Sequence, residues 1–217
     1  MRYSDIAARS LALAALGFFR REEESQMPFA ILAPNVLDQC TVSELQKSAR
    51  GQQFAEVCFE GEKPIFQLSR APLLSPFSAS VFQEDPNKPA SRLNLDLTLD
   101  GPTRETLEAF DRYFSEKLKE IAPNKNWHKL VQENAGYPAR VRCKINVSGP
   151  SGARIWGADQ TALGNIRQVD TCGASLTACV RIGKLWIMGP SAGLSLECAH
   201  LVIADSPSSA NADVFPL

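Results

Sequence analysis

The chain has 217 residues, of which 44% are hydrophobic and 22% are charged, so it is long enough to bury one sizeable core. Its formal net charge of -1 excludes a protein that is basic overall, and any surface that attracts a polyanion must therefore be local. One globular domain with extensions at its ends is the expectation.

The N-terminal segment is set apart from the rest by its composition. An apolar run over residues 11–19 is flanked by arginines and is too short to span a bilayer. The stretch Arg20-Arg21-Glu22-Glu23-Glu24 stands where a signal peptide needs a small-residue cleavage site. An organelle presequence and a functional start at Met27 remain as alternatives. We predict three parts: an N-terminal extension over residues 1–26, a single OB-type domain over residues 27–205 and a flexible tail over residues 206–217.

Six cysteines are present, and none belongs to a C-x-x-C pair. We expect reduced thiols and hence a reducing compartment, namely nucleus, cytoplasm or virus factory, with an organelle as the alternative if the extension is a presequence. His128 and His200 have no cysteine or carboxylate at zinc-ligand spacing, so no metal and no cofactor is predicted. A thiol hydrolase using Cys143 or Cys198 is a distant alternative, because no nucleophile elbow surrounds either residue.

From Met27 onward the apolar pattern mostly has a period of two, which predicts strands. Residues 52–70 predict two short strands around the turn Glu60-Gly61-Glu62, in the manner of a hairpin. The proline-broken residues 72–82 predict an edge strand or an ordered loop. In residues 92–101 leucines alternate with polar residues, which predicts a half-buried strand.

One long helix is predicted directly after that strand. Pro102 and Thr103 make a good helix start, Pro123 ends the helix, and apolar residues recur between them at steps of three and four. Residues 124–138 are expected to hold one or two further helical turns. The apolar positions of the long helix are Leu107, Phe110, Phe114, Leu118 and Ile121.

The strand predicted over residues 139–147 has an unusual polar face. Apolar residues alternate with Arg140, Arg142 and Lys144, so three cations point to one side. Neighbouring like charges on one sheet face repel each other unless an anion lies across them, which favours a polyanion partner. A solubilising strand face is the alternative.

The surrounding sequence favours the polyanion. Residues 137–190 contain seven Lys or Arg residues and two Asp residues, together with Trp156 and Trp186. Cations interleaved with aromatic residues at strand positions are typical of proteins that bind single-stranded nucleic acid, because charge follows the phosphates and flat rings stack on unpaired bases. Core packing is the alternative for each tryptophan.

The order of the elements carries a resemblance to a known family. A strand, a helix and then several short strands with glycine-rich turns are compatible with an OB-type Greek-key barrel. The stretches LNLDLTLDGPTRETLEAFDRYFSEKLKEI, RVRCKINVSG, ARIWGADQ and SLTACVRIGKLWIMGPSAGLSLECAHLVIAD follow one another in the order and spacing of that pattern. They resemble the OB-fold single-stranded-DNA-binding proteins of T7-like phages and of giant DNA viruses of algae, over residues 72–205. The fold class implied is mainly β with one long helix, an OB-type barrel with an N-terminal extension.

The function predicted from these patterns and from the resemblance is non-enzymatic. The protein is expected to bind single-stranded DNA in replication, recombination or repair. A single-stranded-RNA-binding protein and a protein-only β-barrel module for interaction or virion structure stay open as alternatives. No membrane partner is expected, and homo-oligomerisation is left open. The predicted nucleic-acid contacts are Arg140, Arg142, Lys144, Arg154, Trp156, Arg181, Lys184 and Trp186, with Trp127 as a further candidate for stacking.

The C-terminal tail departs from the family pattern. The phage proteins that the chain resembles have a long acidic tail with an aromatic end, which recruits replication partners. This chain ends in DSPSSANADVFPL, a stretch rich in Ser, Ala and Pro that is expected to be disordered. The resemblance assigns partner binding to Asp213 and Phe215, and an inert end is the alternative.

Overall fold

The computed structural model of the chain describes residues 29–49, 51–82, 90–164 and 166–205. The predicted N-terminal extension and the tail, with Asp213 and Phe215, lie outside these ranges.

The described residues form thirteen strands, one long helix and two short 3-10 helices. The strands are β1 (Cys40–Val42), β2 (Gln46–Lys47), β3 (Gln53–Phe59), β4 (Ile65–Gln67), β5 (Leu73–Leu74), β6 (Ser80–Phe82), β7 (Arg92–Thr98), β8 (Asn126–His128), β9 (Val131–Gln132), β10 (Arg140–Asn146), β11 (Arg154–Gly157), β12 (Ser175–Met188) and β13 (Ser191–Asp205). The helices are α2 (Gly101–Ile121), η1 (Pro34–Gln39) and η2 (Ile166–Gln168).

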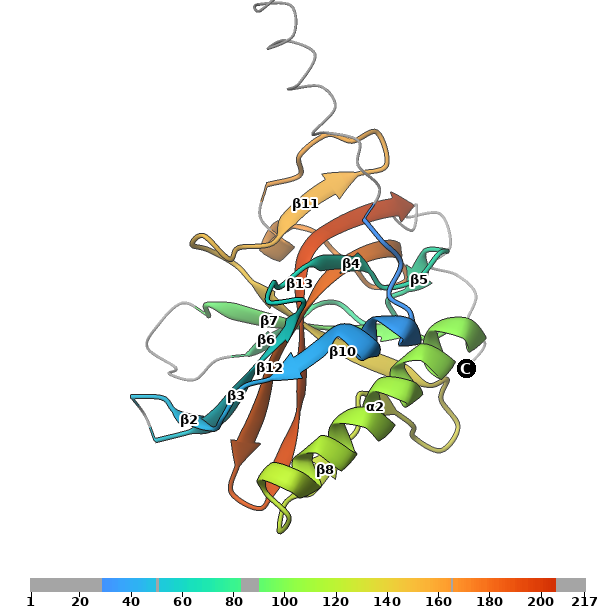
Figure 1. Cartoon of the computed structure of the whole chain (residues 1–217). Helices are drawn as coiled ribbons and strands as arrows, with labels where there is room; N and C mark the ends of the chain where they lie inside the picture. Colours follow the sequence, from blue (N-terminus) through green and yellow to red (C-terminus); the bar gives the residue numbers. More distant parts are fainter. Residues whose placement is uncertain (1–28, 50, 83–89, 165, 206–217) are drawn as a thin grey trace, which may run out of the picture.

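All the strands belong to one sheet, whose hydrogen-bonded path runs β1-β3-β12-β13-β10-β7-β6 (Figure 1). The other strands attach to this path: β2 to β3, β4 and β5 to β12, β8 and β11 to β13, and β9 to β10. The two longest strands, β12 and β13, therefore lie at the centre and connect the two halves of the sheet. The path has two ends within the described residues, so the sheet is not closed into a full barrel there.

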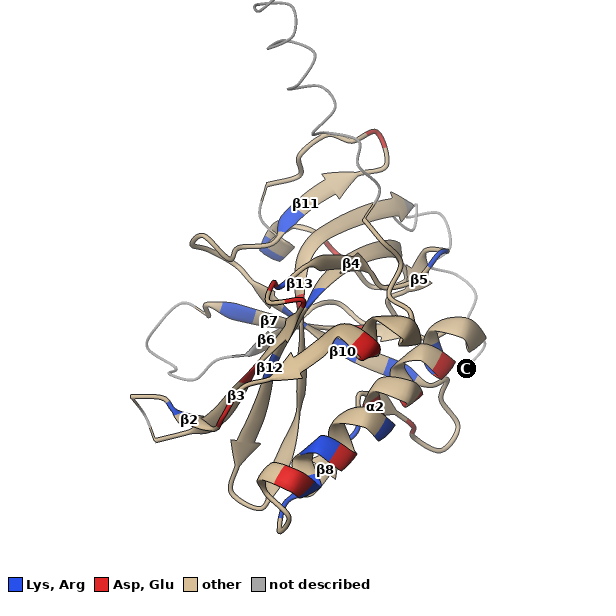
Figure 2. Cartoon of the chain, viewed as in Figure 1, with Lys and Arg blue, Asp and Glu red and all other residues tan. Residues whose placement is uncertain are grey.

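Helix α2 confirms the predicted long helix. Asp100 caps its N-terminus by accepting a hydrogen bond from the Thr103 backbone N–H at 2.8 Å, and Pro102 occupies the first turn. The side facing the sheet buries Leu107, Phe110, Phe114 and Leu118. The opposite side carries interspersed Lys, Arg and Glu residues (Figure 2), so α2 is a core helix with a solvated outer face.

Strands β7 and β10 confirm the alternation seen in the sequence. On β7 the leucines at 93, 95 and 97 are buried, and on β10 Val141, Cys143 and Ile145 are buried. The two strands pair antiparallel with Arg142 opposite Asp96. The cations of β10 therefore share the outward face of the sheet with the polar residues of β7.

The segment after α2 differs from the prediction, because it contains the short strands β8 and β9 instead of helical turns. Asp111 on α2 is buried and accepts hydrogen bonds from the backbone N–H groups of Leu130 and Val131, at 2.8 and 3.2 Å. It also accepts one from the Trp127 indole N–H at 2.9 Å. These contacts from another element hold the segment extended, and local propensity does not decide its conformation.

Residues 52–70 contain the two predicted strands but not a paired hairpin. Strands β3 and β4 both pair antiparallel with β12, one after the other along the same edge. The end of β3 leaves β12 and pairs with β1, where Val57 lies opposite Val42. The chain then reverses at Glu60 and Gly61, which both have positive φ angles, and a single bridge joins Phe59 to Glu62.

Strands β12 and β13 form an antiparallel hairpin with a two-residue turn. Met188 pairs with Ser191, so Gly189 and Pro190 make the whole turn, with Gly189 at a φ of 56°. Gly193 lies inside β13 and takes no part in the reversal. The turn lies near the C-terminal end of α2 (Figure 1), where the Lys125 ammonium donates to the Gly189 carbonyl at 2.8 Å.

The predicted fold class of mainly β structure with one long helix is confirmed, and the described strands form an open sheet in place of a closed barrel. The edge character predicted for residues 72–82 is confirmed as well, since β6 ends the path of the sheet. No helix in the described part of the chain is long and apolar enough to cross a membrane.

Candidate nucleic-acid interface

A row of aromatic side chains crosses the outward face of the sheet at the β12–β13 hairpin. Trp186 on β12 lies opposite Phe54 on β3 and opposite Gly193 on β13, and Gly193 in turn lies opposite His128 on β8. Residues directly opposite each other point to the same face. The Trp186 and His128 rings have centroids 6.1 Å apart. We call Phe54, Trp186 and His128 the aromatic row; Phe54 and Trp186 are half-buried and His128 is exposed.

Gly193 is the position that lets the Trp186 ring lie over the neighbouring strand. A Cβ atom at residue 193 would be 2.7 Å from Cζ2 of Trp186 and 3.1 Å from the His128 carbonyl oxygen. The absent side chain therefore creates the space between the two rings of the row. This close approach explains a glycine inside a strand, where glycine otherwise weakens the structure.

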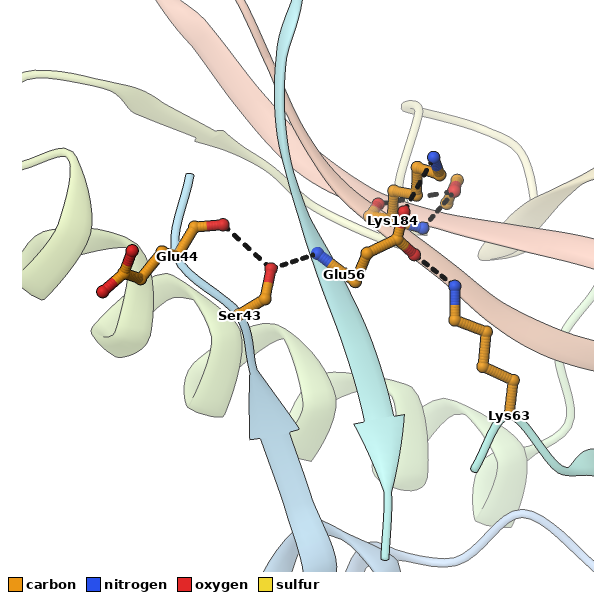
Figure 3. A network of polar contacts seen from close by, with 6 residues as sticks. Ser43, Glu44, Glu56, Lys63 and Lys184 are labelled. Atoms are coloured by element: carbon orange, nitrogen blue, oxygen red, sulfur yellow. Dashed lines mark hydrogen bonds and ion pairs between the residues drawn. The ribbon is translucent and has the colours of Figure 1, made fainter. Parts of the chain in front are cut away.

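Lys184 brings a positive charge to one end of the aromatic row. Its ammonium lies 3.9 Å from the centroid of the Phe54 ring, within the range of a cation–π interaction. The same ammonium lies 2.8 Å from Oε1 of Glu56, and Lys63 contacts the other carboxylate oxygen (Figure 3). Burial raises the pKa of Glu56, but the hydrogen bonds and charges of Lys184 and Lys63 outweigh it, so the pKa lies below its usual range.

A polar groove of about 500 Å³ continues from the other end of the aromatic row. It lies between the β8–β9 segment and β10. His128 belongs to both the row and the groove, so the two features form one continuous surface. The groove is lined by His128, Lys129, Val131, Gln132, Glu133, Asn134, Arg140 and Arg142.

The arginines of β10 have an anion of their own in this structure. Asp96 on β7 accepts hydrogen bonds from Nε and a terminal nitrogen of Arg142, at 2.7 and 3.0 Å. Arg140 lies 3.9 Å from the same carboxylate. The hydrogen bond to Asp96 raises the pKa of Arg142, although burial opposes it. Two cations thus share one carboxylate, which offsets part of the repulsion inferred from the sequence.

Lys144 and Arg181 lie one row further along the outward face. Glu197 on β13 stands opposite both residues, Lys144 on β10 and Arg181 on β12. Burial lowers the pKa of Lys144, the charge of Arg92 lowers it further, and Glu197 opposes both effects. Here too, one carboxylate stands between two cations.

Arg154 lies on the next row, beside His200 on β13. The ring of His200 also packs against Phe29, with centroids 5.1 Å apart. Burial lowers the pKa of His200, and the charges of Arg154 and Arg181 lower it further. The two arginines therefore place positive charge on both sides of a half-buried imidazole.

Trp156 lies far from the aromatic row. On β11 it stands opposite Val202, which pairs with Thr177 on β12. Thr177 is nine positions from Trp186, or about 30 Å along an extended strand. Trp127 points inward, where it packs against the core and its indole N–H bonds to Asp111. One predicted group, formed by Arg140, Arg142, Lys184 and Trp186, borders the row and groove, and the other, formed by Arg154, Trp156 and Arg181, lies toward β11, with Lys144 between them.

Several residues of this surface were not identified from the sequence. Phe54 had a detectable signal, because it stands in the outward phase of a strand whose inward residues Ala55 and Val57 are buried. His128 and Lys129 had none, since residues 124–138 were expected to be helical. Lys63 lies in the connection between β3 and β4, and it joins this group of residues through its ion pair with Glu56.

Cys143 and Cys198, the two cysteines considered as nucleophiles, are both buried. Burial, with a contribution from the charge of Asp96, raises the pKa of the Cys143 thiol to about 12. Burial also raises the pKa of the Cys198 thiol well above its ordinary value. Because a raised pKa disfavours the nucleophilic thiolate, these two sites do not favour the thiol-hydrolase alternative.

No protein family matches the chain, and no curated protein is similar to it in sequence. Ten chains of solved structures match it in three dimensions. Among them is gp2.5, a single-stranded DNA-binding protein encoded by bacteriophage T7, with 13% identity and a TM-score of 0.42, covering 65% of this chain and 86% of that one. The single-stranded DNA-binding protein of bacteriophage Enc34 in complex with single-stranded DNA has 6% identity and a TM-score of 0.46, covering 77% and 97%. The same Enc34 protein in another structure has 7% identity and a TM-score of 0.42, covering 81% and 96%. The resemblance to proteins of giant algal viruses stays a prediction.

Proposed function

We propose that this chain is a non-enzymatic single-stranded-DNA-binding protein. The DNA would lie across the outward face formed by the aromatic row and the polar groove. The observation that carries the proposal is the row itself. Phe54, Trp186 and His128 come from three different strands and are brought into one line by register. Rings in this arrangement offer stacking surfaces to successive unpaired bases, which a duplex cannot use.

Cations lie at both ends of this row. Lys184 lies at one end, and Lys129, Arg140 and Arg142 line the groove at the other. Positive charge on both sides of the rings suits a nucleic-acid backbone that is held while its bases stack. A protein-only module would not require cations and partly accessible rings to gather on one face, so we favour nucleic acid.

The finer parts of the proposal concern the biological role. A sequence-independent single-strand binder fits replication, recombination or repair, where unpaired DNA is exposed. Asp213 and Phe215 in the tail are proposed to contact replication proteins. RNA remains the alternative ligand, and competition between matched DNA and RNA oligonucleotides separates the two.

The experiment measures fluorescence anisotropy of labelled oligothymidine and of a duplex of the same length at two salt concentrations. We expect preference for the single strand and a log-log salt slope of roughly -3 to -4, from about 0.7 per phosphate for four to six contacts. Trp186→Ala should lose about 1–3 kcal/mol of binding free energy. Met188→Ala is the control, because it removes an exposed apolar side chain two positions along the same strand. Equal affinity for duplex, or a flat salt response, would contradict the proposal.

A further inference from the structure

Glu56 is a carboxylate that lies among the cations of the outward face. Its two oxygens contact two different lysines, Lys184 through Oε1 at 2.8 Å and Lys63 through Oε2 (Figure 3). The backbone around it is held in place, because the Glu56 N–H donates to Ser43 Oγ at 2.9 Å and the Glu56 carbonyl accepts from the Ser43 N–H at 2.9 Å. The carboxylate therefore has a fixed position between the two ammonium groups.

Asp96 forms a second ion-paired cluster on the outward face, and register places Glu197 between two further cations. Asp96 is shared by Arg140 and Arg142. Glu197 stands opposite both Lys144 and Arg181. In each cluster the cations outnumber the carboxylate, so each cluster keeps a net positive charge. Three repetitions of one pattern on one face indicate a common physical cause.

The cause we assign is a compromise between the stability of the free protein and its affinity for the ligand. Without the carboxylates, the five cations on β10 and β12 and Lys63 in the connection between β3 and β4 would repel one another and destabilise the sheet in the free protein. A carboxylate between two cations removes much of that repulsion. It also occupies the position and the hydrogen-bond donors that a phosphate oxygen would use, so it competes with the ligand.

We propose that Glu56 is an internal counter-ion that lowers the affinity of this face for single-stranded DNA, and that Lys63 and Lys184 form the phosphate contact that it competes for. Asp96 and Glu197 have the same role in their clusters. The inference rests on the proposed function and deepens it, because it names the residues that keep the complex reversible. Phe54, under the Lys184 ammonium, places a stacking ring directly beside this phosphate contact.

Glu56→Gln tests the proposal, because it keeps the shape of the side chain and removes its charge. We expect it to bind oligothymidine at least about threefold more tightly at low salt, with a smaller gain at high salt. Glu44→Gln is the matched control. Glu44 is exposed and follows Ser43, the residue that bonds to the Glu56 backbone (Figure 3). Its backbone carbonyl accepts a hydrogen bond from Ser43 Oγ, and the substitution leaves that carbonyl in place. Its affinity should change less than twofold.

A positioning role for Glu56 predicts the opposite sign. If the carboxylate served to orient the two lysines for the DNA, Glu56→Gln would bind more weakly, and this outcome would overturn the proposal, as would unchanged affinity.

The double variant Lys63→Gln, Glu56→Gln should lose most of the affinity that Glu56→Gln gains, because one of the two lysines that would contact the phosphate is then absent. If Glu56→Gln lowers the melting temperature so far that it unfolds in the assay, Asp96→Asn makes the same measurement in the second cluster, with the same expected direction. Failure of the wild-type protein to bind any oligonucleotide would refute the proposed function instead.

Discussion

At the scale of single residues, the aromatic row depends on a side chain that is missing. Gly193 leaves room for the Trp186 ring, and a Cβ atom there would approach the ring to 2.7 Å. Gly193→Ala should therefore displace the ring, lower the free energy of unfolding by about 1–3 kcal/mol and change the tryptophan emission. Thermal unfolding and fluorescence of the purified variant measure both effects. Gly101→Ala is the control, because no heavy atom lies within 4 Å of the added Cβ; equal behaviour of the two variants would contradict the packing described here.

His200 gives the protein a pH dependence with a defined sign. Its pKa in the folded state is lowered by burial and by Arg154 and Arg181, whereas the unfolded chain has the ordinary value of about 6.5. As pH falls through about 6.5, the unfolded chain takes up this proton more readily, so the free energy of unfolding decreases until pH passes the folded-state pKa.

The prediction for His200 is tested by melting temperatures between pH 7.5 and 5. His200→Gln should lose less stability than the wild type over this range, because glutamine takes up no proton. Arg154→Gln should reduce the difference in part, since it removes one of the two charges that lower the pKa. Parallel curves for wild type and His200→Gln would show that the histidine does not contribute.

At the scale of elements, sequence periodicity predicted what is decided locally. The leucines of β7, the alternation on β10 and the apolar positions of α2 all lie where their spacing places them. The pairing of Arg142 with Asp96 joins residues 46 positions apart, so it depends on a register that one strand alone does not contain. The strands β8 and β9 were missed for the same reason, since Asp111 on the helix holds them extended.

The register between β7 and β10 changes the experiment that best tests the cations of β10. Judged from the sequence, reversing Arg140, Arg142 and Lys144 to Glu would remove a repulsion and leave the fold intact. In the structure these residues face Asp96 and Glu197, so reversal would gather carboxylates and destabilise the sheet.

Neutral variants avoid this problem. The triple change to Gln at 140, 142 and 144 should keep the buried residues of β10 in place and the protein folded. If these side chains contact phosphates, the variant should bind oligothymidine at least tenfold more weakly, with a salt slope lower by about 0.7 for each lost contact. Melting temperature and affinity are measured on the same preparation. Normal affinity in a folded variant would remove β10 from the proposed interface.

At the scale of the whole molecule, two tracks for the DNA can be drawn on the outward face. One crosses from β3 through β12 and β13 to β8 along the aromatic row, in three inter-strand steps of about 4.8 Å each, and continues into the groove beside β10. The other follows β12 for about 30 Å from Trp186 toward the neighbourhood of Trp156. The first track is short and continuous. The second needs a longer oligonucleotide, because it joins two tryptophans that are far apart.

The length of the oligonucleotide distinguishes these tracks. OB-type domains engage about 4–16 nucleotides, and the crossing track belongs to the lower end of that range. We therefore expect Trp186→Ala to weaken binding of oligothymidines of every length by about 1–3 kcal/mol, because its ring lies on both tracks. Trp156→Ala should leave short oligothymidines of about six nucleotides unaffected and should weaken binding only for longer ones. Anisotropy titrations of both variants against a length series make the measurement, with thermal unfolding as the check that each variant is folded. If Trp156→Ala weakens binding of the shortest oligonucleotide as strongly as Trp186→Ala does, the strand follows β12 and the crossing track is wrong.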